Sequence, residues 1–144
     1  MSAPLVVDAS VMVRLLLEEP GTEAADADIF HDPRWIALIA PSILVSETAA
    51  AITKKFRRKE IRRESAMEAF RDWQTILGDR VFTIFPASDF VDAAFELSLR
   101  LHHPLHDCIY LALAQAQEAA IATCDSVLAR KARELGIATE LITA

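Results

Sequence analysis

The strongest constraint on the fold is a short apolar run near the start of the chain that ends in an aspartate. Residues 5–7 are Leu-Val-Val, which favour a buried strand, and Asp8 and Ser10 then lead directly into an apolar helix. A strand followed at once by a helix is typical of α/β proteins with a parallel sheet. Such sheets bind ligands outside the carboxyl ends of their strands. Asp8 is therefore predicted to face a ligand at this edge.

The rest of the chain continues the alternation of strands and helices. Apolar, β-favouring runs predict further strands at 35–40, 81–85, 120–123 and 139–142. Helices are expected at 10–18, 22–30, from 42 into the charged run 54–59, and at 64–77, 88–101, 107–117 and 126–135. We therefore expect one α/β domain over residues 1–144, with a five-stranded parallel sheet covered by helices on both faces.

The long helix that starts near Ser42 carries apolar residues at helical spacing. Val45, Ala49, Ile52 and Phe56 recur every three or four residues, which places them on one face. This face is predicted to pack into the core.

Composition excludes several classes of protein. The 144 residues include only three glycines, so no glycine-rich phosphate loop is available. A net charge of −6 argues against binding to nucleic acid by bulk charge alone. Cys108 and Cys124 lie in apolar surroundings and are expected to be free thiols. Neither a signal peptide nor a membrane-length apolar run is found, which predicts a soluble cytoplasmic protein.

Four acidic residues stand out because their neighbours are apolar or small. Asp8 and Asp125 each follow an apolar strand, Glu47 lies one turn into the long helix, and Asp107 opens the most apolar helix. Parallel strands bring Asp8 and Asp125 to the same edge of the sheet. Buried carboxylates need a compensating charge, and no lysine lies in these segments. The pattern indicates a hard cation such as Mg²⁺ or Mn²⁺.

Each of these signals also has a purely structural interpretation. Asp8, Asp107 and Asp125 could be helix N-caps, and Glu47 could be a solvent-facing residue of a first turn. Ser10 is a good N-cap as well, and Thr123 could be an ordinary strand residue. A zinc site could be formed by His102, His103 and His106. However, a His-His-Pro sequence at a helix break favours a loop.

Four segments, taken together and in this order, resemble the PIN domain family. They are VVDAS at 6–10, PSILVSE at 41–47, HDCIYLALA at 106–114 and ATCD at 122–125. The resemblance implies a three-layer α/β/α fold and a Mg²⁺-dependent ribonuclease in which Mn²⁺ substitutes. The family's acidic quartet then matches Asp8, Glu47, Asp107 and Asp125, and its two auxiliary polar positions match Ser10 and Thr123.

The resemblance also implies a mechanism and partners. The three aspartates would bind the metal directly or through water, and Glu47 would bind a second ion or orient the attacking water. A chain of this length is similar to the VapC toxins of bacterial toxin–antitoxin pairs, which implies an antitoxin partner and a homodimer. Cleavage of RNA would leave a 5′-phosphate and a 3′-hydroxyl.

Two other functions are consistent with parts of the pattern. A phosphotransfer protein would phosphorylate a strand-end aspartate, but it needs a lysine after a later strand, where this chain has Asp125. A catalytically silent PIN-fold interaction module would usually lack one of the acids.

A basic run follows Glu47 on the same helix. If the helix continues, Lys54 and Arg58 share a face with Glu47 and form a track for an RNA backbone. The alternative is a solvated helix end whose cations are favoured by the helix dipole.

Overall fold

The computed structural model describes residues 3–17 and 32–143, and the helix expected at 22–30 lies outside them. All five predicted strands are present in these ranges. They are β1 (Ala3–Val7), β2 (Trp35–Pro41), β3 (Phe82–Phe85), β4 (Ala120–Thr123) and β5 (Thr139–Leu141). Every neighbouring pair is parallel, and the strand order is β3-β2-β1-β4-β5.

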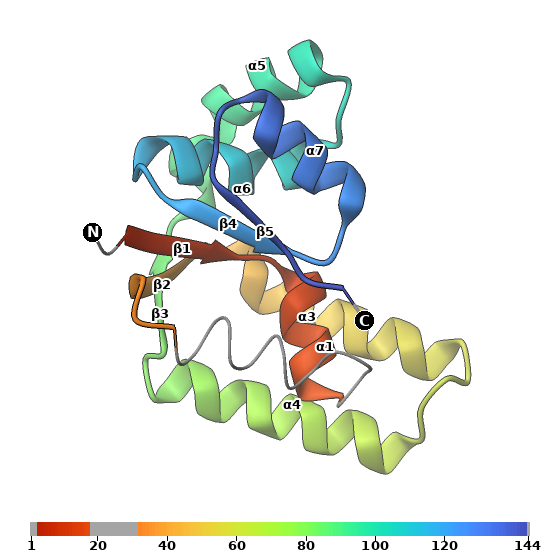
Figure 1. Cartoon of the computed structure of the whole chain (residues 1–144). Helices are drawn as coiled ribbons and strands as arrows, with labels where there is room; N and C mark the ends of the chain where they lie inside the picture. Colours follow the sequence, from red (N-terminus) through yellow and green to blue (C-terminus); the bar gives the residue numbers. More distant parts are fainter. Residues whose placement is uncertain (1–2, 18–31, 144) are drawn as a thin grey trace.

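Helices cover both faces of this sheet, which confirms the predicted α/β/α architecture. They are α1 (Ala9–Leu16), α3 (Ile43–Arg57), α4 (Arg63–Gly78), the short 3₁₀ helix η1 (Ala87–Phe90), α5 (Val91–Leu101), α6 (Leu105–Ala116) and α7 (Ser126–Glu134). In the view of Figure 1, α5, α6 and α7 lie above the strands, and α1, α3 and α4 lie below them. No helix in the described ranges is long and apolar enough to cross a membrane.

The order of the strands sets the position of the site. From β1 the chain proceeds outwards through β2 to β3, and later returns to place β4 on the other side of β1. The strand order therefore reverses between β1 and β4, where α/β proteins bind ligands. Val7 of β1 pairs with Ala122 of β4, so the residues that follow, Asp8 and Thr123, lie side by side. Asp125 follows two residues later.

Helix α6 is the centre of the core. Its sequence is apolar on nearly every side, and the residues from Cys108 to Ala114 are all buried. It packs against β1, β2 and β4, while α5 covers its outer side. Cys108 and Cys124 are not joined by a disulfide, as the sequence predicts.

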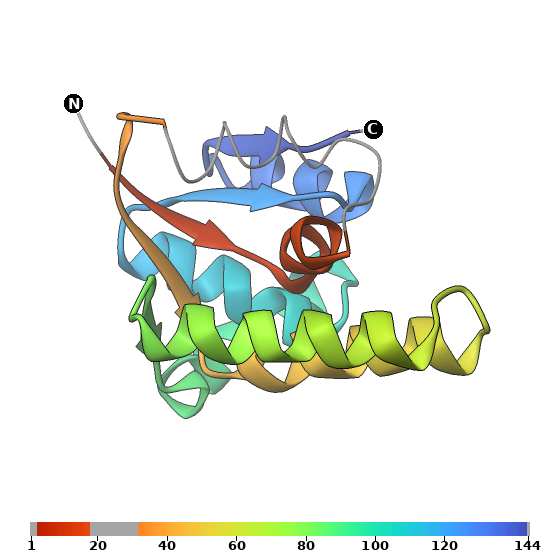
Figure 2. The ribbon, with the colours of Figure 1, turned by 90° about the horizontal axis from the view of Figure 1, so that it is seen from below.

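Helix α3 buries a face that is shifted from the one predicted, and Ile52 is common to both. The buried residues are Leu44, Thr48 and Ile52, while Val45 and Phe56 are exposed. The reason is the course of the helix, because α3 forms a hairpin with α4 whose connecting turn projects beyond the sheet (Figure 2). Residues near this turn lie beyond the core, so Phe56 keeps 42% of its surface exposed.

The packing of α6 predicts a large loss of stability when a core leucine is shortened. Leu111 is fully buried, whereas Met67 on α4 is 43% exposed. Leu111→Ala should lower the free energy of unfolding by about 2–5 kcal/mol, which corresponds to roughly 6–15 °C in melting temperature. The control variant Met67→Ala should melt within about 3 °C of the wild type. Equal melting temperatures for the two variants in a thermal scan would contradict this description of the core.

Candidate functional site

Asp8 lies at the end of β1 with only 7% of its surface exposed. Its Oδ1 accepts hydrogen bonds from the Ser10 hydroxyl at 2.6 Å and from the Val11 N–H at 3.2 Å. The Thr123 hydroxyl donates to Oδ2. Burial raises the pKa of Asp8 to about 6, although these three hydrogen bonds act in the opposite direction. A charge at this position is costly unless a cation compensates it.

Thr123 and Ser10 join the ends of β1 and β4. The Thr123 hydroxyl, which donates to Asp8, also accepts from the Asp125 N–H at 3.0 Å. The Ser10 hydroxyl accepts from the Cys124 N–H at 2.9 Å. Ser10 is not the N-cap of α1, because Asp8 takes that position, and Thr123 is the last residue of β4. The two hydroxyls therefore hold the segments of Asp8 and Asp125 together.

Asp125 is the N-cap of α7. Its Oδ1 accepts from the N–H groups of Val127 and Leu128 at 2.8 and 3.2 Å. The Oδ2 atom takes part in neither bond, and the side chain is exposed at the edge of the sheet. Capping thus fixes the carboxylate through Oδ1 and does not use Oδ2.

Glu47 projects from α3 towards α6. The Tyr110 hydroxyl donates to Glu47 Oε1 at 2.7 Å, and His106 Nδ1 lies 3.7 Å from Oε2. Burial, together with the neighbouring Glu47 carboxylate, raises the pKa of Tyr110 far above its usual value. The phenol therefore stays protonated and can only donate to Glu47.

Asp107 lies in the first turn of α6 and is not its N-cap, which is Pro104. Its Oδ2 is 2.8 Å from Nε2 of His103, a residue with 8% of its surface exposed. His103 is fixed in turn by its backbone, because its carbonyl accepts from the Ser98 hydroxyl at 2.6 Å. The Asp107 side chain is about one-third exposed, so it can face solvent while one oxygen is held.

All four acids line a single pocket of about 410 Å³ at the carboxyl edge of the sheet. Its other lining residues come from α1, α3 and α6: Ala9, Ser10, Ala50, Ala51, Lys54, Arg57 and Tyr110. Thr123 is fully buried behind Asp8 and does not line the pocket. The structure thus brings together the four acidic residues that the sequence singles out.

The donor set suits a hard cation in a partly hydrated site. Within residues 3–17 and 32–143, no lysine or arginine forms a salt bridge with any of the four acids. No group of three or more His, Cys, Asp or Glu side chains in these ranges already converges on one point. Mg²⁺ does not need such a cage, because it keeps several waters and usually takes one or two carboxylates plus phosphate oxygens from a substrate.

Two basic residues of α3 line the pocket of the four acids. They are Lys54, which belongs to the predicted track, and Arg57, which the sequence did not single out. Arg58 is the C-cap of α3 and does not line the pocket, and its contact with RNA stays a prediction.

The sequence suggested no role for Tyr110 or Arg57, and it suggested one for His103 only as a member of a histidine zinc site. Tyr110 is the only tyrosine of the chain and lies three residues after Asp107, a spacing that places both on one face of α6. His103 precedes Asp107 by four residues but stands outside the helix, so only the fold reveals its contact.

Comparison with known proteins agrees with this geometry. The family model described as PIN domain matches residues 5–134. The chain belongs to the PIN domain family. Two solved structures share its fold at low sequence identity. PAE2754 from Pyrobaculum aerophilum has a TM-score of 0.68 at 20% identity, with 96% of this chain and 90% of that chain covered.

The second structure is VapBC2 from Rickettsia felis bound to a DNA fragment from its promoter. It has a TM-score of 0.66 at 14% identity, with 97% of this chain and 99% of that chain covered. No curated protein matches the sequence. PIN domains are generally nucleases, and those nucleases generally use divalent metal ions. In the present chain, the four acids line one pocket.

Proposed function

We propose that this PIN domain is a Mg²⁺-dependent endoribonuclease, and that it acts in the cytoplasm as the toxin of a VapBC-type pair. The observation that carries the proposal is the pocket that Asp8, Glu47, Asp107 and Asp125 line together. These acids come from four separate segments of the chain, and none of them forms a salt bridge with a lysine or arginine of the described ranges. Carboxylates gathered in this way are chemically suited to Mg²⁺, with Mn²⁺ as a substitute.

Other residues of the chain hold the acidic side chains in a fixed orientation. Asp8 is held by Ser10 and Thr123, and Asp125 is held by the N-terminus of α7. Asp8, Asp107 and Asp125 would hold the ion directly or through water. Glu47, fixed by Tyr110, would hold a second ion or orient the attacking water. When bound, Mg²⁺ supplies activation of water for attack on phosphorus and neutralises charge on the phosphoryl oxygens.

Partners follow from the same proposal. One similar structure is a VapBC complex, which supports a small antitoxin as the partner of this chain. A homodimer is supported by Val91, Phe95 and Leu99, exposed apolar residues spaced four apart along α5. Light scattering that gives a monomer mass at micromolar concentration would contradict the homodimer.

Incubation of purified protein with labelled single-stranded RNA tests the activity. Cleavage is expected in Mg²⁺ and not in EDTA, and the products should carry a 5′-phosphate and a 3′-hydroxyl. A DNA strand of the same sequence serves as the control for substrate class. Products with a cyclic phosphate, or cleavage that persists in EDTA, would contradict a metal-activated water as the nucleophile.

His103 should tune the affinity for metal because it holds Asp107. Loss of a partner that orients a metal ligand typically weakens metal binding about 10–100-fold. His103→Leu is expected to weaken Mn²⁺ binding in this range, while His103→Gln, which keeps an N–H donor, should recover part of it. The exposed neighbour His102 provides the control His102→Leu. If titration gave equal Mn²⁺ affinity for all three variants, His103 would not tune the affinity for metal.

A further inference from the structure

The turn between α3 and α4 concentrates positive charge on an acidic protein. Residues 54–63 contain seven of the chain's 15 lysines and arginines and one acid, Glu60, although the net charge is −6. In the described part of the chain, Lys54, Arg57 and Arg62 form no salt bridge. Unpaired cations gathered at the end of a projecting hairpin favour contact with a polyanion.

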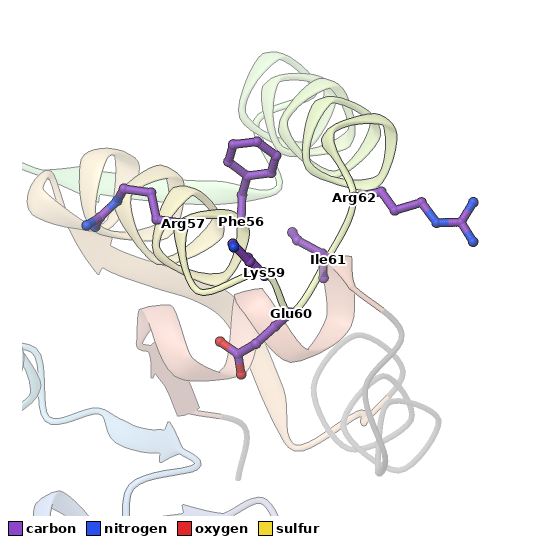
Figure 3. A pocket seen from close by; sticks show the side chains of 6 residues that line it. All are labelled: Phe56, Arg57, Lys59, Glu60, Ile61 and Arg62. Atoms are coloured by element: carbon purple, nitrogen blue, oxygen red, sulfur yellow. The ribbon is translucent and has the colours of Figure 1, made fainter.

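A second pocket, of about 420 Å³, lies at this turn, and we call it the tip pocket. Its lining residues are Phe56, Arg57, Lys59, Glu60, Ile61 and Arg62. Figure 3 shows Phe56 and Ile61 between the end of α3 and the start of α4, with Arg57 and Arg62 extending to opposite sides. The Glu60 carboxylate extends away from Phe56. The pocket thus offers an aromatic ring and an aliphatic side chain flanked by cations.

The tip pocket and the pocket of the four acids share one lining residue. Arg57 lines both of them, and Lys54 lines the acidic pocket one turn earlier on α3. Glu47 and Arg57 are ten residues apart on one helix, a rise of about 15 Å. A strand of a few nucleotides that starts at the acids could therefore pass Lys54 and Arg57 and reach the tip pocket.

We propose that the tip pocket is a subsite for single-stranded RNA, in which one base stacks on Phe56 while Arg57 and Arg62 contact the flanking phosphates. The proposal rests on the proposed ribonuclease function and adds a base-binding site outside the acidic pocket. Proteins that bind single strands combine a basic path with aromatic side chains on which bases stack. Phe56 and Arg57 supply this combination, and the exposure of Phe56 leaves its ring accessible.

A solvated helix end, with cations favoured by the helix dipole, would account for the charges alone. It would not account for an exposed aromatic ring among them, and it predicts no effect of Phe56 on RNA binding. The role of Phe56 therefore distinguishes the two explanations.

The test measures RNA affinity in protein that carries Asp8→Asn, so that the strand stays intact in Mg²⁺. Fluorescence anisotropy with a labelled 12-nucleotide single-stranded RNA gives the dissociation constant. Stacking on an aromatic residue contributes about 1–3 kcal/mol per base, so Phe56→Ala should weaken binding about 5–150-fold. Phe56→Tyr should bind like the parent, because it keeps an aromatic ring. Phe70→Ala on α4, which also removes an exposed phenylalanine, is the matched control and should leave the affinity unchanged.

A set of RNAs with one abasic position each then tests stacking directly. At the position whose base stacks on Phe56, the abasic RNA should bind the parent protein more weakly than the intact RNA does. The Phe56→Ala variant should bind this abasic RNA and the intact RNA equally well. Additive losses at every position, or an unchanged affinity for Phe56→Ala, would overturn the subsite.

The two proposals fail in different ways. If the wild type cleaves RNA in Mg²⁺ and Phe56→Ala binds RNA equally well, only the subsite is overturned. If the wild type neither binds nor cleaves single-stranded RNA, the ribonuclease proposal is wrong and the subsite falls with it.

Discussion

Replacement of Asp107 by Asn is expected to lower RNA cleavage at least about 100-fold, because a metal ligand supplies several kcal/mol of transition-state stabilisation. Asn keeps the shape of the side chain and one oxygen, but it lacks the charge that holds a divalent cation. The contact with His103 can persist, since the amide oxygen also accepts a hydrogen bond. The variant should therefore fold as the wild type does and lose only activity.

Asp92 supplies a matched control for this substitution. It lies in the first turn of α5, as Asp107 lies in the first turn of α6, but it is outside the pocket of the four acids. Asp92→Asn should cleave RNA at the rate of the wild type. Single-turnover cleavage in Mg²⁺ and a thermal scan in EDTA are measured for both variants. Activity in Asp107→Asn close to that of Asp92→Asn would remove Asp107 from the site.

Expression of the wild-type chain in a bacterial host without a partner protein should stop growth. A ribonuclease that is not held by an antitoxin degrades RNA the cell needs. Asp8→Asn should allow normal growth, because it removes the most buried carboxylate of the pocket. Asn can still accept from the Val11 N–H and bond with the two hydroxyls, so the protein should accumulate.

Growth curves after induction, with the protein level checked by immunoblot, give the comparison. Asp89→Asn, an exposed acid of η1, is the control and should stop growth like the wild type. Growth arrest that persists in Asp8→Asn at equal protein level would show that toxicity arises from something other than the proposed nuclease.

The α/β/α architecture could be predicted from the sequence because the apolar pattern within each segment agrees with the alternation of strands and helices along the chain. Each predicted strand is an apolar run between turn residues, and β4 begins and ends where expected, at Ala120 and Thr123. Helix α5 likewise buries Ala94, Leu97 and Leu101, which recur at helical spacing. These signals depend on periodicity within one segment, which a single sequence contains in full.

Asp8 and Asp125 were interpreted either as helix N-caps or as metal ligands. Both interpretations are compatible with the structure. Asp8 and Asp125 are the N-caps of α1 and α7, as the structural interpretation holds. They also line the pocket with Glu47 and Asp107. A cap uses one carboxylate oxygen for backbone N–H groups, so capping fixes the side chain and does not exclude a second role.

Features that depend on contacts between segments could not be read from the sequence. The buried face of α3 is set by where the helix leaves the sheet, and this is why Phe56 is exposed although its spacing predicted burial. The hydrogen bonds of Tyr110 to Glu47 and of His103 to Asp107 depend on how α6 packs against α3 and α5. The side chains that contact the acids were missed for this reason, whereas the gathering of the four acids at one edge of the sheet was predicted.

The central claim is that the four acids hold a divalent ion that hydrolyses RNA. The most direct test is a titration of Mn²⁺ into metal-stripped protein, with the rate of RNA cleavage measured at each concentration for the wild type and for Asp8→Asn. We predict no cleavage without metal, a saturable rise in the wild type, and no rise in Asp8→Asn. Cleavage without metal, or the same Mn²⁺ dependence in both proteins, would contradict the claim.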